Sequence, residues 1–207
     1  MRQETALKII ALLRKDLDSG ITILEMSKRL KIGYRPAYNH VSSMEKEGII
    51  AINKVGNAKQ CFLNLENAKC RHFLAETDML RKDELLKTNQ KLKDVIENLT
   101  TKLNETNIAD IHSIVLFGSY VKGTATKSSD VDLLFIVADI KDKSVRESIE
   151  RECAGYQYSH NVKVSPLITD VIEFKKMLKS KELNVGKEAR AYGLPLYGSE
   201  VFWRLMT

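Results

Sequence analysis

The sequence predicts an α/β domain at its C-terminal end, preceded by a mainly α-helical module and a helical connector. Three observations lead to this prediction. In residues 1–65, apolar side chains recur at helical spacing and are followed by two short alternating runs. Residues 66–107 contain neither glycine nor proline. In residues 108–207, apolar runs typical of strands flank a segment that ends in two closely spaced aspartates.

The bulk composition is that of a folded globular protein. The chain has 207 residues, of which 43% are apolar, enough for two small domains or one of ordinary size. It contains no run of about 18 uncharged apolar residues, the length that a membrane span needs. The apolar stretch near the N-terminus is interrupted by Lys8, and no small-residue cleavage site follows it. We therefore expect neither a membrane span nor a signal peptide.

The three cysteines, Cys61, Cys70 and Cys153, are scattered along the chain and show no metal-ligand spacing. An odd number of cysteines suits a reducing compartment better than a disulfide framework. We expect three partly buried, apolar thiols in a cytoplasmic protein.

The positive charge of the chain is concentrated at its N-terminal end. The formal net charge is +6. Residues 1–65 hold 11 Lys and Arg against 6 Asp and Glu, residues 66–107 hold 8 of each, and residues 108–207 hold 14 against 13. A local basic excess of this kind is typical of a segment that contacts a phosphate backbone. Double-stranded DNA is therefore the expected partner of residues 1–65.

Residues 1–65 are expected to form three helices followed by a β-hairpin. Thr22 and Glu25 have the spacing of a capping box and would begin the second helix. Pro36 would lie in the first turn of the third helix, where proline is tolerated. The expected ranges are residues 2–17, 23–30 and about 36–47 for the helices, and residues 49–52 and 60–65 for the strands.

This order of elements, together with the phrase Met-Glu-Lys-Glu-Gly-Ile-Ile at residues 44–50, resembles the winged helix-turn-helix family over about the first 65 residues. The resemblance implies that the third helix enters the major groove of DNA and that the hairpin reaches phosphates. The candidate DNA-contacting residues are Arg35, Tyr38, Asn39, His40, Ser42 and Ser43 on the third helix, and Lys54 and Lys59 on the hairpin. The alternative is a winged-helix module that binds protein or only dimerises.

The connector, residues 66–107, carries charges of both signs and is expected to form one long helix or two in sequence. Leu92, Ile96, Leu99 and Leu103 follow one another at steps of four, three and four residues. This Leu92–Leu103 seam has the spacing of a coiled coil and would hold a homodimer together. The alternative is that the helix packs on the chain's own C-terminal domain.

The strongest chemical signal lies between two predicted strands, Ile111–Phe117 and Leu133–Val137. Gly118-Ser119 follows the first strand at once, and ten residues separate Ser119 from Asp130. Glycine permits a sharp turn that brings backbone N–H groups and the serine hydroxyl close to phosphate oxygens. Asp130 and Asp132 alternate along a strand, so both carboxylates lie on one face. There they can share Mg²⁺, which prefers oxygen ligands together with substrate phosphates.

This Gly-Ser-x10-Asp-x-Asp pattern closely resembles the signature of the minimal nucleotidyltransferases in the DNA polymerase β-like superfamily. The resemblance implies an α/β nucleotidyltransferase domain over residues 108–207, with a mixed sheet and flanking helices. It also implies Mg²⁺ as the cofactor and ATP or another nucleoside triphosphate as the substrate. Asp130 and Asp132 are then the catalytic and metal-binding residues, and the nucleotide-binding candidates are Gly118, Ser119, Lys122, Gly123 and Ser129.

The resemblance further implies a third carboxylate on a later strand, where it completes the metal site and accepts the proton of the attacking hydroxyl. The matching strand is Val162–Ile168, and Lys163 stands at the aligned position, with Ser165 as its neighbour on the same face. Lysine repels Mg²⁺, and serine is a poor ligand and a poor base. Asp170 and Glu173, just beyond the strand, are the candidates for a replacement carboxylate.

Two functions follow from these observations. In the first, the protein transfers a nucleotidyl group, AMP from ATP, to a hydroxyl of a protein or a small molecule. Members of this type often modify a partner toxin. In the second, it is a DNA-binding transcriptional regulator whose nucleotidyltransferase domain senses a nucleotide without turnover. Lys163 favours the second function, and the intact Gly-Ser turn and aspartate pair favour the first.

Overall fold

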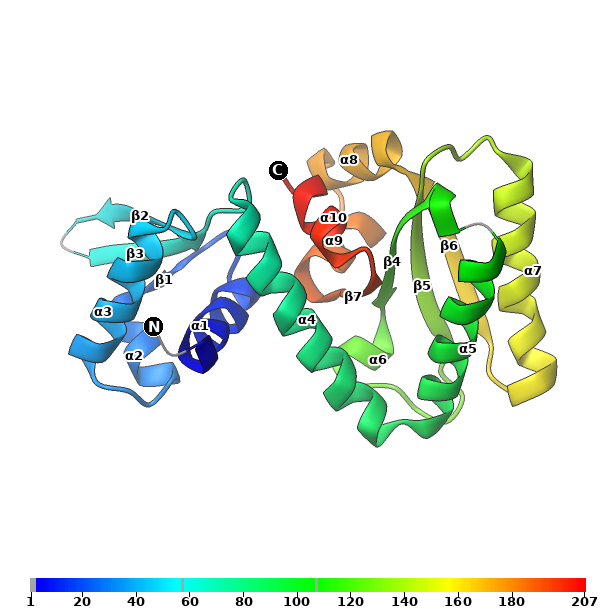
Figure 1. Ribbon diagram of the computed structural model, residues 1–207, viewed down its shortest axis with the longest axis horizontal. Helices are drawn as coiled ribbons and strands as arrows, with labels where there is room; N and C mark the ends of the chain where they lie inside the picture. Colours follow the sequence, from blue (N-terminus) through cyan, green and yellow to red (C-terminus); the bar gives the residue numbers. More distant parts are fainter. Residues whose placement is uncertain (1–2, 57, 107) are drawn as a thin grey trace. The chain divides into compact units, whose positions relative to one another are not determined.

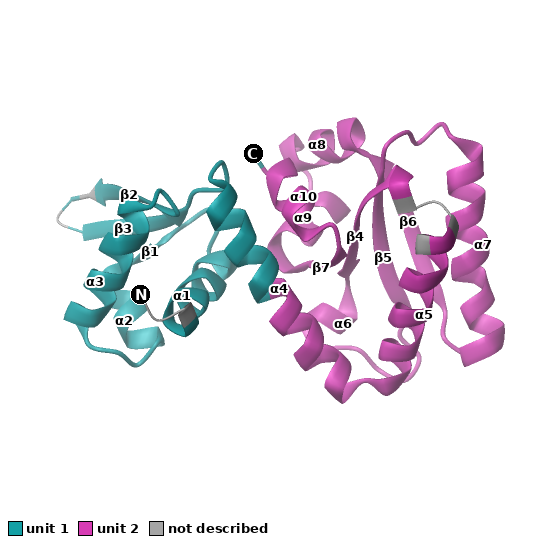
Figure 2. Cartoon of the chain, in the orientation of Figure 1, with its two compact units in different colours: residues 1–77, 207 teal, residues 78–206 magenta. Residues whose placement is uncertain are grey.

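The structure is a computed structural model that describes residues 3–56, 58–106 and 108–207 (Figure 1). The chain forms two compact units, one of residues 1–77 with residue 207 and the other of residues 78–206 (Figure 2). The boundary falls inside one helix, α4 (Ala68–Thr88). Each unit has its own sheet.

The first unit consists of three helices and a small antiparallel sheet, in the order that the sequence predicts. The helices are α1 (Gln3–Lys15), α2 (Ile23–Arg29) and α3 (Tyr34–Lys46), and the strands β1 (Ile21–Thr22), β2 (Ile50–Val55) and β3 (Ala58–Leu63) lie in the order β1-β3-β2. The Thr22 hydroxyl caps α2 by accepting a hydrogen bond from the backbone N–H of Glu25 at 3.2 Å. Apolar residues at helical spacing, such as Ile9 and Leu13 of α1 and Met44 of α3, are buried in its core.

The hairpin is longer at its tip than the sequence predicts. β2 continues to Val55, and β3 already begins at Ala58. The ladder places Lys54 directly opposite Lys59. Polar residues interrupt the apolar alternation in this part of the hairpin, so the sequence pattern does not predict the strands here. The strands form nonetheless, because backbone hydrogen bonds extend the ladder regardless of side-chain polarity. The predicted turn includes Asn57, which lies outside the described residues.

The second unit has a four-stranded mixed sheet covered by helices. After the end of α4, its elements are α5 (Gln90–Thr106), η1 (Ile108–Asp110), β4 (Ile111–Phe117), α6 (Ser119–Lys122), β5 (Val131–Val137), α7 (Lys143–His160), β6 (Val164–Asp170), α8 (Val171–Lys179), α9 (Val185–Tyr192), β7 (Leu194–Tyr197) and α10 (Ser199–Leu205). The strand order is β6-β5-β4-β7. β5 and β6 are parallel and are connected through α7, whereas β4 is antiparallel to both of its neighbours. The mixed α/β fold class is confirmed.

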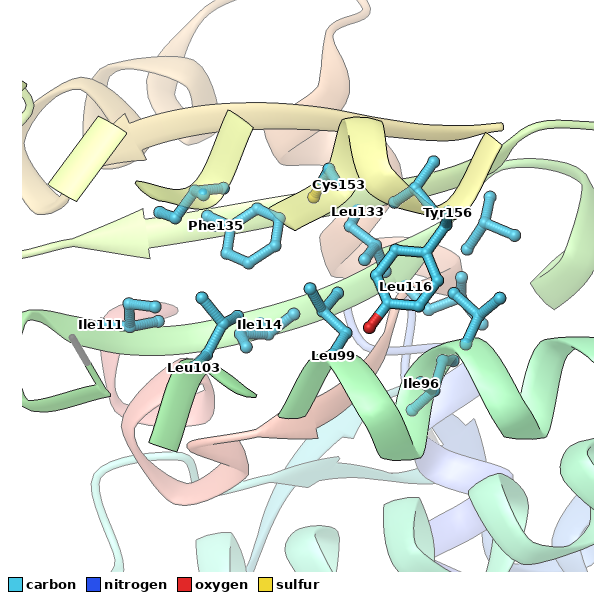
Figure 3. Close-up of a cluster of buried hydrophobic side chains, with 14 of the residues drawn as sticks. Ile96, Leu99, Leu103, Ile111, Ile114, Leu116, Leu133, Phe135, Cys153 and Tyr156 are labelled. Atoms are coloured by element: carbon cyan, nitrogen blue, oxygen red, sulfur yellow. The ribbon is translucent and has the colours of Figure 1, made fainter. Parts of the chain in front are cut away.

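The core of the second unit covers one face of the sheet, and Asp132 of β5 lies on the other face. Ile114 of β4 and Phe135 of β5 belong to the same buried cluster as Leu99 of α5 and Cys153 of α7 (Figure 3). These two helices therefore cover the face on which the odd-numbered residues of β5 lie. Because side chains alternate across a strand, Asp132 points to the opposite face.

The Leu92–Leu103 seam is part of this core. Its four residues are each exposed by 2% or less, and they pack against the chain's own sheet and α7 (Figure 3). The expectation of a coiled-coil homodimer through this seam is therefore corrected in favour of the intramolecular alternative. Heptad-like spacing buries the same side chains against a sheet as against a second helix, so spacing alone could not distinguish the two. The connector is two helices, which meet at Asn89.

The cysteines are free and buried, as their scattered positions predict. Burial raises the pKa of the Cys61 thiol to about 11 and the pKa values of Cys70 and Cys153 to about 12. The thiols are therefore protonated near neutral pH, and they act as small apolar core residues.

Among the described residues, no helix combines the length and the apolarity that a membrane span requires.

Candidate active site

The turn after β4 brings the backbone against an aspartate. Gly118 has φ +73°, in the region that favours glycine. A Cβ atom at this position would lie 2.2 Å from Oδ2 of Asp132, so any other residue would displace that carboxylate. Ser119 begins α6, a single helical turn that ends at Gly123, which has φ +70°. The two glycines predicted to bind nucleotide therefore open and close one short turn.

Asp132 meets this turn because it lies opposite Phe117 in the antiparallel β4–β5 ladder. Asp130 lies two residues earlier, just before β5 begins. The two carboxylates have opposite pKa shifts. The pKa of Asp132 is raised, mainly by burial and then by the negative charges of Asp130 and Glu188. The pKa of Asp130 is lowered, mainly by a hydrogen bond from Lys163.

Lys163 lies directly beside Asp130, as its aligned position predicts. The parallel register of β5 and β6 places Asp132 opposite Ser165 and carries Asp130 and Lys163 to the same end of the ladder. Nζ of Lys163 is 2.5 Å from Oδ2 of Asp130, and the Ser165 hydroxyl donates a hydrogen bond to the same oxygen at 3.1 Å. The hydrogen bond to Asp130 raises the pKa of Lys163, so its ammonium stays charged. The Lys163 ammonium is therefore bound to Asp130, one of the two carboxylates.

Asp170 and Glu173, the predicted candidates for a replacement carboxylate, lie away from the Asp130–Lys163 pair, which corrects the expectation that they could serve there. Asp170 pairs with Val137 at the other end of the β5–β6 ladder, five residues beyond Ser165. At about 3.3 Å per residue that is roughly 17 Å away. Asp170 caps α8 by accepting the Glu173 N–H at 2.8 Å, and Glu173 pairs with Lys176 at 2.6 Å.

Lys122, a predicted nucleotide-binding residue, is held by a carboxylate that the sequence did not single out. Its ammonium lies 2.7 Å from Oε1 of Glu188 on α9 and 5.6 Å from the centre of the Tyr192 ring. The hydrogen bond from Lys122 to Glu188 raises the lysine's pKa. Glu188 was missed because more than sixty residues separate it from Lys122 in the sequence, and no local pattern connects them.

Ser129, the last predicted nucleotide-binding residue, is engaged within its own loop. Its hydroxyl accepts a hydrogen bond from the backbone N–H of Thr126 at 2.8 Å, and its own N–H donates to the Thr126 carbonyl at 3.2 Å. This closed turn shapes the chain immediately before Asp130. These two hydrogen bonds indicate that Ser129 stabilises the conformation of the loop. Its contact with a nucleotide stays a prediction.

The predicted DNA-contacting residues all reach the surface of the first unit. Arg35, Tyr38, Asn39 and Lys54 are exposed, and His40, Ser42, Ser43 and Lys59 are partly exposed. Nζ of Lys59 lies 5.2 Å from the centre of the Tyr38 ring, so it connects the hairpin with α3. Tyr34, which the sequence reading did not include, stacks on Tyr38 with the ring centres 6.4 Å apart. Contact of this surface with DNA stays a prediction.

Fold and site together define the class of protein. A mixed sheet with a Gly-Ser turn packed against an Asp-x-Asp pair is the arrangement of a nucleotidyltransferase domain, and the first unit has the elements of a winged helix. A family model described as a nucleotidyltransferase domain matches residues 84–192, and a winged helix-turn-helix DNA-binding model matches residues 2–51. The chain belongs to the nucleotidyltransferase domain family. The matched range begins within α4 and includes all of α5.

Similar proteins are named for adenylyl transfer. A provisionally named protein adenylyltransferase of Methanocaldococcus jannaschii, MJ1305, is 28% identical over 115 residues, which are 55% of this chain and 76% of that protein. A second protein of that organism with the same provisional name, MJ0141, is 25% identical over 50% of this chain and 92% of its own length. The protein adenylyltransferase MntA of Shewanella oneidensis is 35% identical over 64 residues, 31% of this chain and 46% of that protein.

Solved structures of toxin–antitoxin complexes are similar to part of the chain. One contains AMP-PNP and another is a mutant of an MntA–HpeT complex, with identities of 22% and 19%. Both alignments cover 53% of this chain and 81% of the other, with a TM-score of 0.35. A TM-score this low adds nothing to the family match.

Proposed function

We propose that the protein is a Mg²⁺-dependent nucleotidyltransferase that transfers AMP from ATP to a hydroxyl group of a protein. The names of the three relatives support ATP as the donor and a protein as the acceptor. One observation carries the proposal: the Gly118 turn is packed against Asp132, with Asp130 two residues away. This contact brings backbone donors for phosphate and carboxylates for a cation to the same place.

Asp130 and Asp132 suit Mg²⁺ as ligands. Mg²⁺ is usually held by one or two carboxylates together with substrate phosphates and water, not by a cage of protein ligands. The described residues contain no group of three or more His, Cys, Asp or Glu that could hold a metal ion, so the proposed site has two carboxylates. When bound, Mg²⁺ would supply positive charge that neutralises the phosphates as pyrophosphate leaves.

The chain's own residues hold the nucleotide in the proposed reaction. The acceptor oxygen forms a bond to the α-phosphorus of ATP while the bond from that phosphorus to the bridging oxygen of the β-phosphate breaks. AMP stays on the acceptor and pyrophosphate leaves. Backbone N–H groups of the Gly118 turn and the Ser119 hydroxyl hold the leaving phosphates. Lys122 can join them only by leaving its ion pair with Glu188.

The proton of the acceptor hydroxyl has no carboxylate of β6 near Asp130 to receive it, because Asp170 lies at the other end of that strand. Lys163 is an ammonium and cannot accept a proton, and the lowered pKa of Asp130 makes this carboxylate a weak base. We infer that the proton passes to water. Because a missing general base costs a factor of about 10²–10⁴ in rate, the proposed transfer is slow.

The first unit is proposed to bind double-stranded DNA through α3 and the hairpin. The local charge excess, the exposed polar residues of α3 and the DNA-binding description of the matched family model support this role. A partner protein, such as a toxin, would carry the acceptor hydroxyl. A regulator that senses nucleotide without turnover is the less favoured function, because the relatives are named for transfer and the Gly-Ser turn and aspartate pair are intact.

The test determines which phosphate of ATP is transferred to protein. Full-length protein is incubated with Mg²⁺, a cell extract of the organism that produces it, and ATP labelled on either the α- or the γ-phosphate. We expect protein-bound label from the α-phosphate only. Asp132→Asn should remove it, whereas Asp139→Asn, an exposed aspartate just beyond the other end of β5, should not. Incorporation of the γ-label would instead indicate a kinase, and unchanged labelling by Asp132→Asn would exclude this site.

A further inference from the structure

A pocket of about 1100 Å³, lined by mostly polar residues, opens beside the aspartate pair in the second unit. Four segments that are distant in the sequence line it: the junction of α4 and α5, Tyr120 of α6, the loop of residues 125–130, and the end of α7 with residues 161–163. These segments lie together at the lower end of the second unit in Figure 1. Asp130 and Lys163 border the pocket, whereas Gly118, Ser119 and Asp132 do not.

The pocket adjoins the phosphate-binding turn, because Tyr120 of α6 and Ser129 belong to its lining, but it borders the aspartate pair at Asp130 and not at Asp132. The Gly118 turn meets the pair on the side of Asp132, and the pocket meets it on the side of Asp130. In transfers at phosphorus, the attacking and leaving oxygens lie roughly in line. If pyrophosphate leaves along the Gly118 turn, the acceptor must enter from the other side. The Asp130 end of the pair, which the pocket borders, is open to such an entry.

The charge of the lining is strongly one-sided. Lys91, Lys127 and Lys163 contribute positive charge, and Asp130 is its one carboxylate. Lys163 is already paired with Asp130. Lys91 and Lys127 are exposed and have no ion-pair partner among the residues that the structure describes. Two lysines are therefore free to contact carboxylates of an incoming molecule.

The remaining lining is rich in side-chain amides, at the α4–α5 junction and at the end of α7. Gln157 and Asn161 lie one helical turn apart and are both exposed. Amide groups both donate and accept hydrogen bonds, so they can pair with the N–H and C=O groups of a polypeptide backbone. Typical small-molecule sites measure about 300–1,000 Å³ and are mostly apolar. A pocket above that size, with several basic and amide side chains in its lining, suits an extended chain better.

We propose that this pocket is the acceptor site and that it receives an extended, acidic polypeptide segment whose hydroxyl side chain reaches the Asp130–Lys163 end. The inference rests on the proposed nucleotidyl transfer and specifies the class of its acceptor. Lys91 and Lys127 would contact acidic side chains on the segment, and the amides would bond to its backbone. ATP binding would depend on the Gly118 turn and not on these two lysines.

The test measures binding of full-length protein to two fluorescein-labelled peptides of equal length with a central tyrosine. Glutamates flank the tyrosine in one peptide and lysines in the other. Fluorescence anisotropy reports binding without any turnover. We expect the glutamate peptide to bind at least about tenfold more tightly, because like charges disfavour the other. The double variant Lys91→Glu/Lys127→Glu should lower its affinity at least about tenfold, with Mg²⁺-dependent ATP affinity unchanged.

The matched control is Lys141→Glu/Lys179→Glu, which reverses two exposed lysines outside the pocket lining. This variant should bind the glutamate peptide as the wild type does, and circular dichroism should show both variants folded. Equal binding of the two peptides, or no binding of either, would overturn the inference. Loss of ATP affinity with peptide binding intact would assign the pocket to the nucleotide instead. Failure of the proposed transfer appears separately, as peptide binding without label incorporation from ATP.

Discussion

The two ends of the β5–β6 ladder carry similar charged residues and use them differently. At one end, Asp170 caps α8 and Glu173 pairs with Lys176, all within a stretch of seven residues. At the other end, Asp130 pairs with Lys163, thirty-three residues away in the sequence. The first set satisfies the backbone and side chains of one helix. The second set brings charged residues from separate elements together in the lining of a pocket, as is typical of a binding site.

The pKa values of the two aspartates at the site end support this contrast between the ends of the ladder. At the site end, two aspartates only two residues apart have pKa values shifted in opposite directions. Opposite pKa shifts in two neighbouring aspartates arise where burial and nearby charges differ between the two carboxylates. It separates the roles of the pair, because Asp130 is neutralised by an internal cation while Asp132 faces the Gly118 turn.

The largest expected effect comes from removing the carboxylates at the site end. Asp130→Asn with Asp132→Asn should abolish Mg²⁺-dependent ATP binding in isothermal titration, because both proposed ligands lose their charge. Asp170→Ala at the other end should leave ATP binding intact and lower the free energy of unfolding by about 0.5–2 kcal/mol, the cost of a lost helix cap. ATP affinity that survives in the double variant would exclude the metal-site assignment.

The second effect concerns Lys163. If it replaces a general base, Lys163→Asp should raise AMP transfer, by up to the factor of about 10²–10⁴ that such a base contributes. It should also tighten Mg²⁺ binding, because a positive charge beside the metal is replaced by a ligand. Pyrophosphate release and Mg²⁺ titration measure the two changes. Fast turnover of the wild type, with Lys163→Ala harmless, would show that no carboxylate is needed at this position.

The third prediction extends the comparison to the first unit, whose basic residues lie exposed on α3 and the hairpin. Six phosphate contacts would give a slope of about −5 for log affinity against log salt. Arg35→Ala and Lys54→Ala should each reduce the slope by about 1 if the residue contacts a phosphate. Anisotropy with a DNA duplex over a salt series measures this, with Lys141→Ala in the second unit as the control. Slopes unchanged by either variant would place the DNA contact elsewhere.

The smallest effect is a shift in pH dependence. The raised pKa of Asp132 means that it takes up a proton before Asp130 as the pH falls, so Mg²⁺-dependent ATP binding is present at higher pH and lost first through Asp132. Glu188→Gln removes one negative charge that raises this pKa and frees the nearby Lys122. Both changes should move the Asp132 titration to lower pH. Carbon-13 NMR of the carboxyl groups measures the midpoint, and Glu182→Gln should not move it.

Local patterns in the sequence were sufficient for much of the fold. An apolar run followed by the Gly-Ser turn predicted β4 at Ile111–Phe117, and the two-residue spacing of Asp130 and Asp132 placed them together because β-strand geometry is periodic. The capping box at Thr22 and the helical stripe of α1 are likewise local. The same reading missed Glu188 and the pocket, because residues at those places are connected only through the packing of distant elements.

The sequence by itself determined the order of the elements and the family signature, and the resemblance placed Lys163 where a carboxylate is expected. Only the tertiary structure decided that this lysine binds Asp130, because the parallel register of β5 and β6 sets which residues become neighbours. It also decided that the Leu92–Leu103 seam is buried within one chain and that Asp170 lies at the wrong end of the sheet. Periodicity specifies which face of an element is apolar, but not the surface against which that face packs.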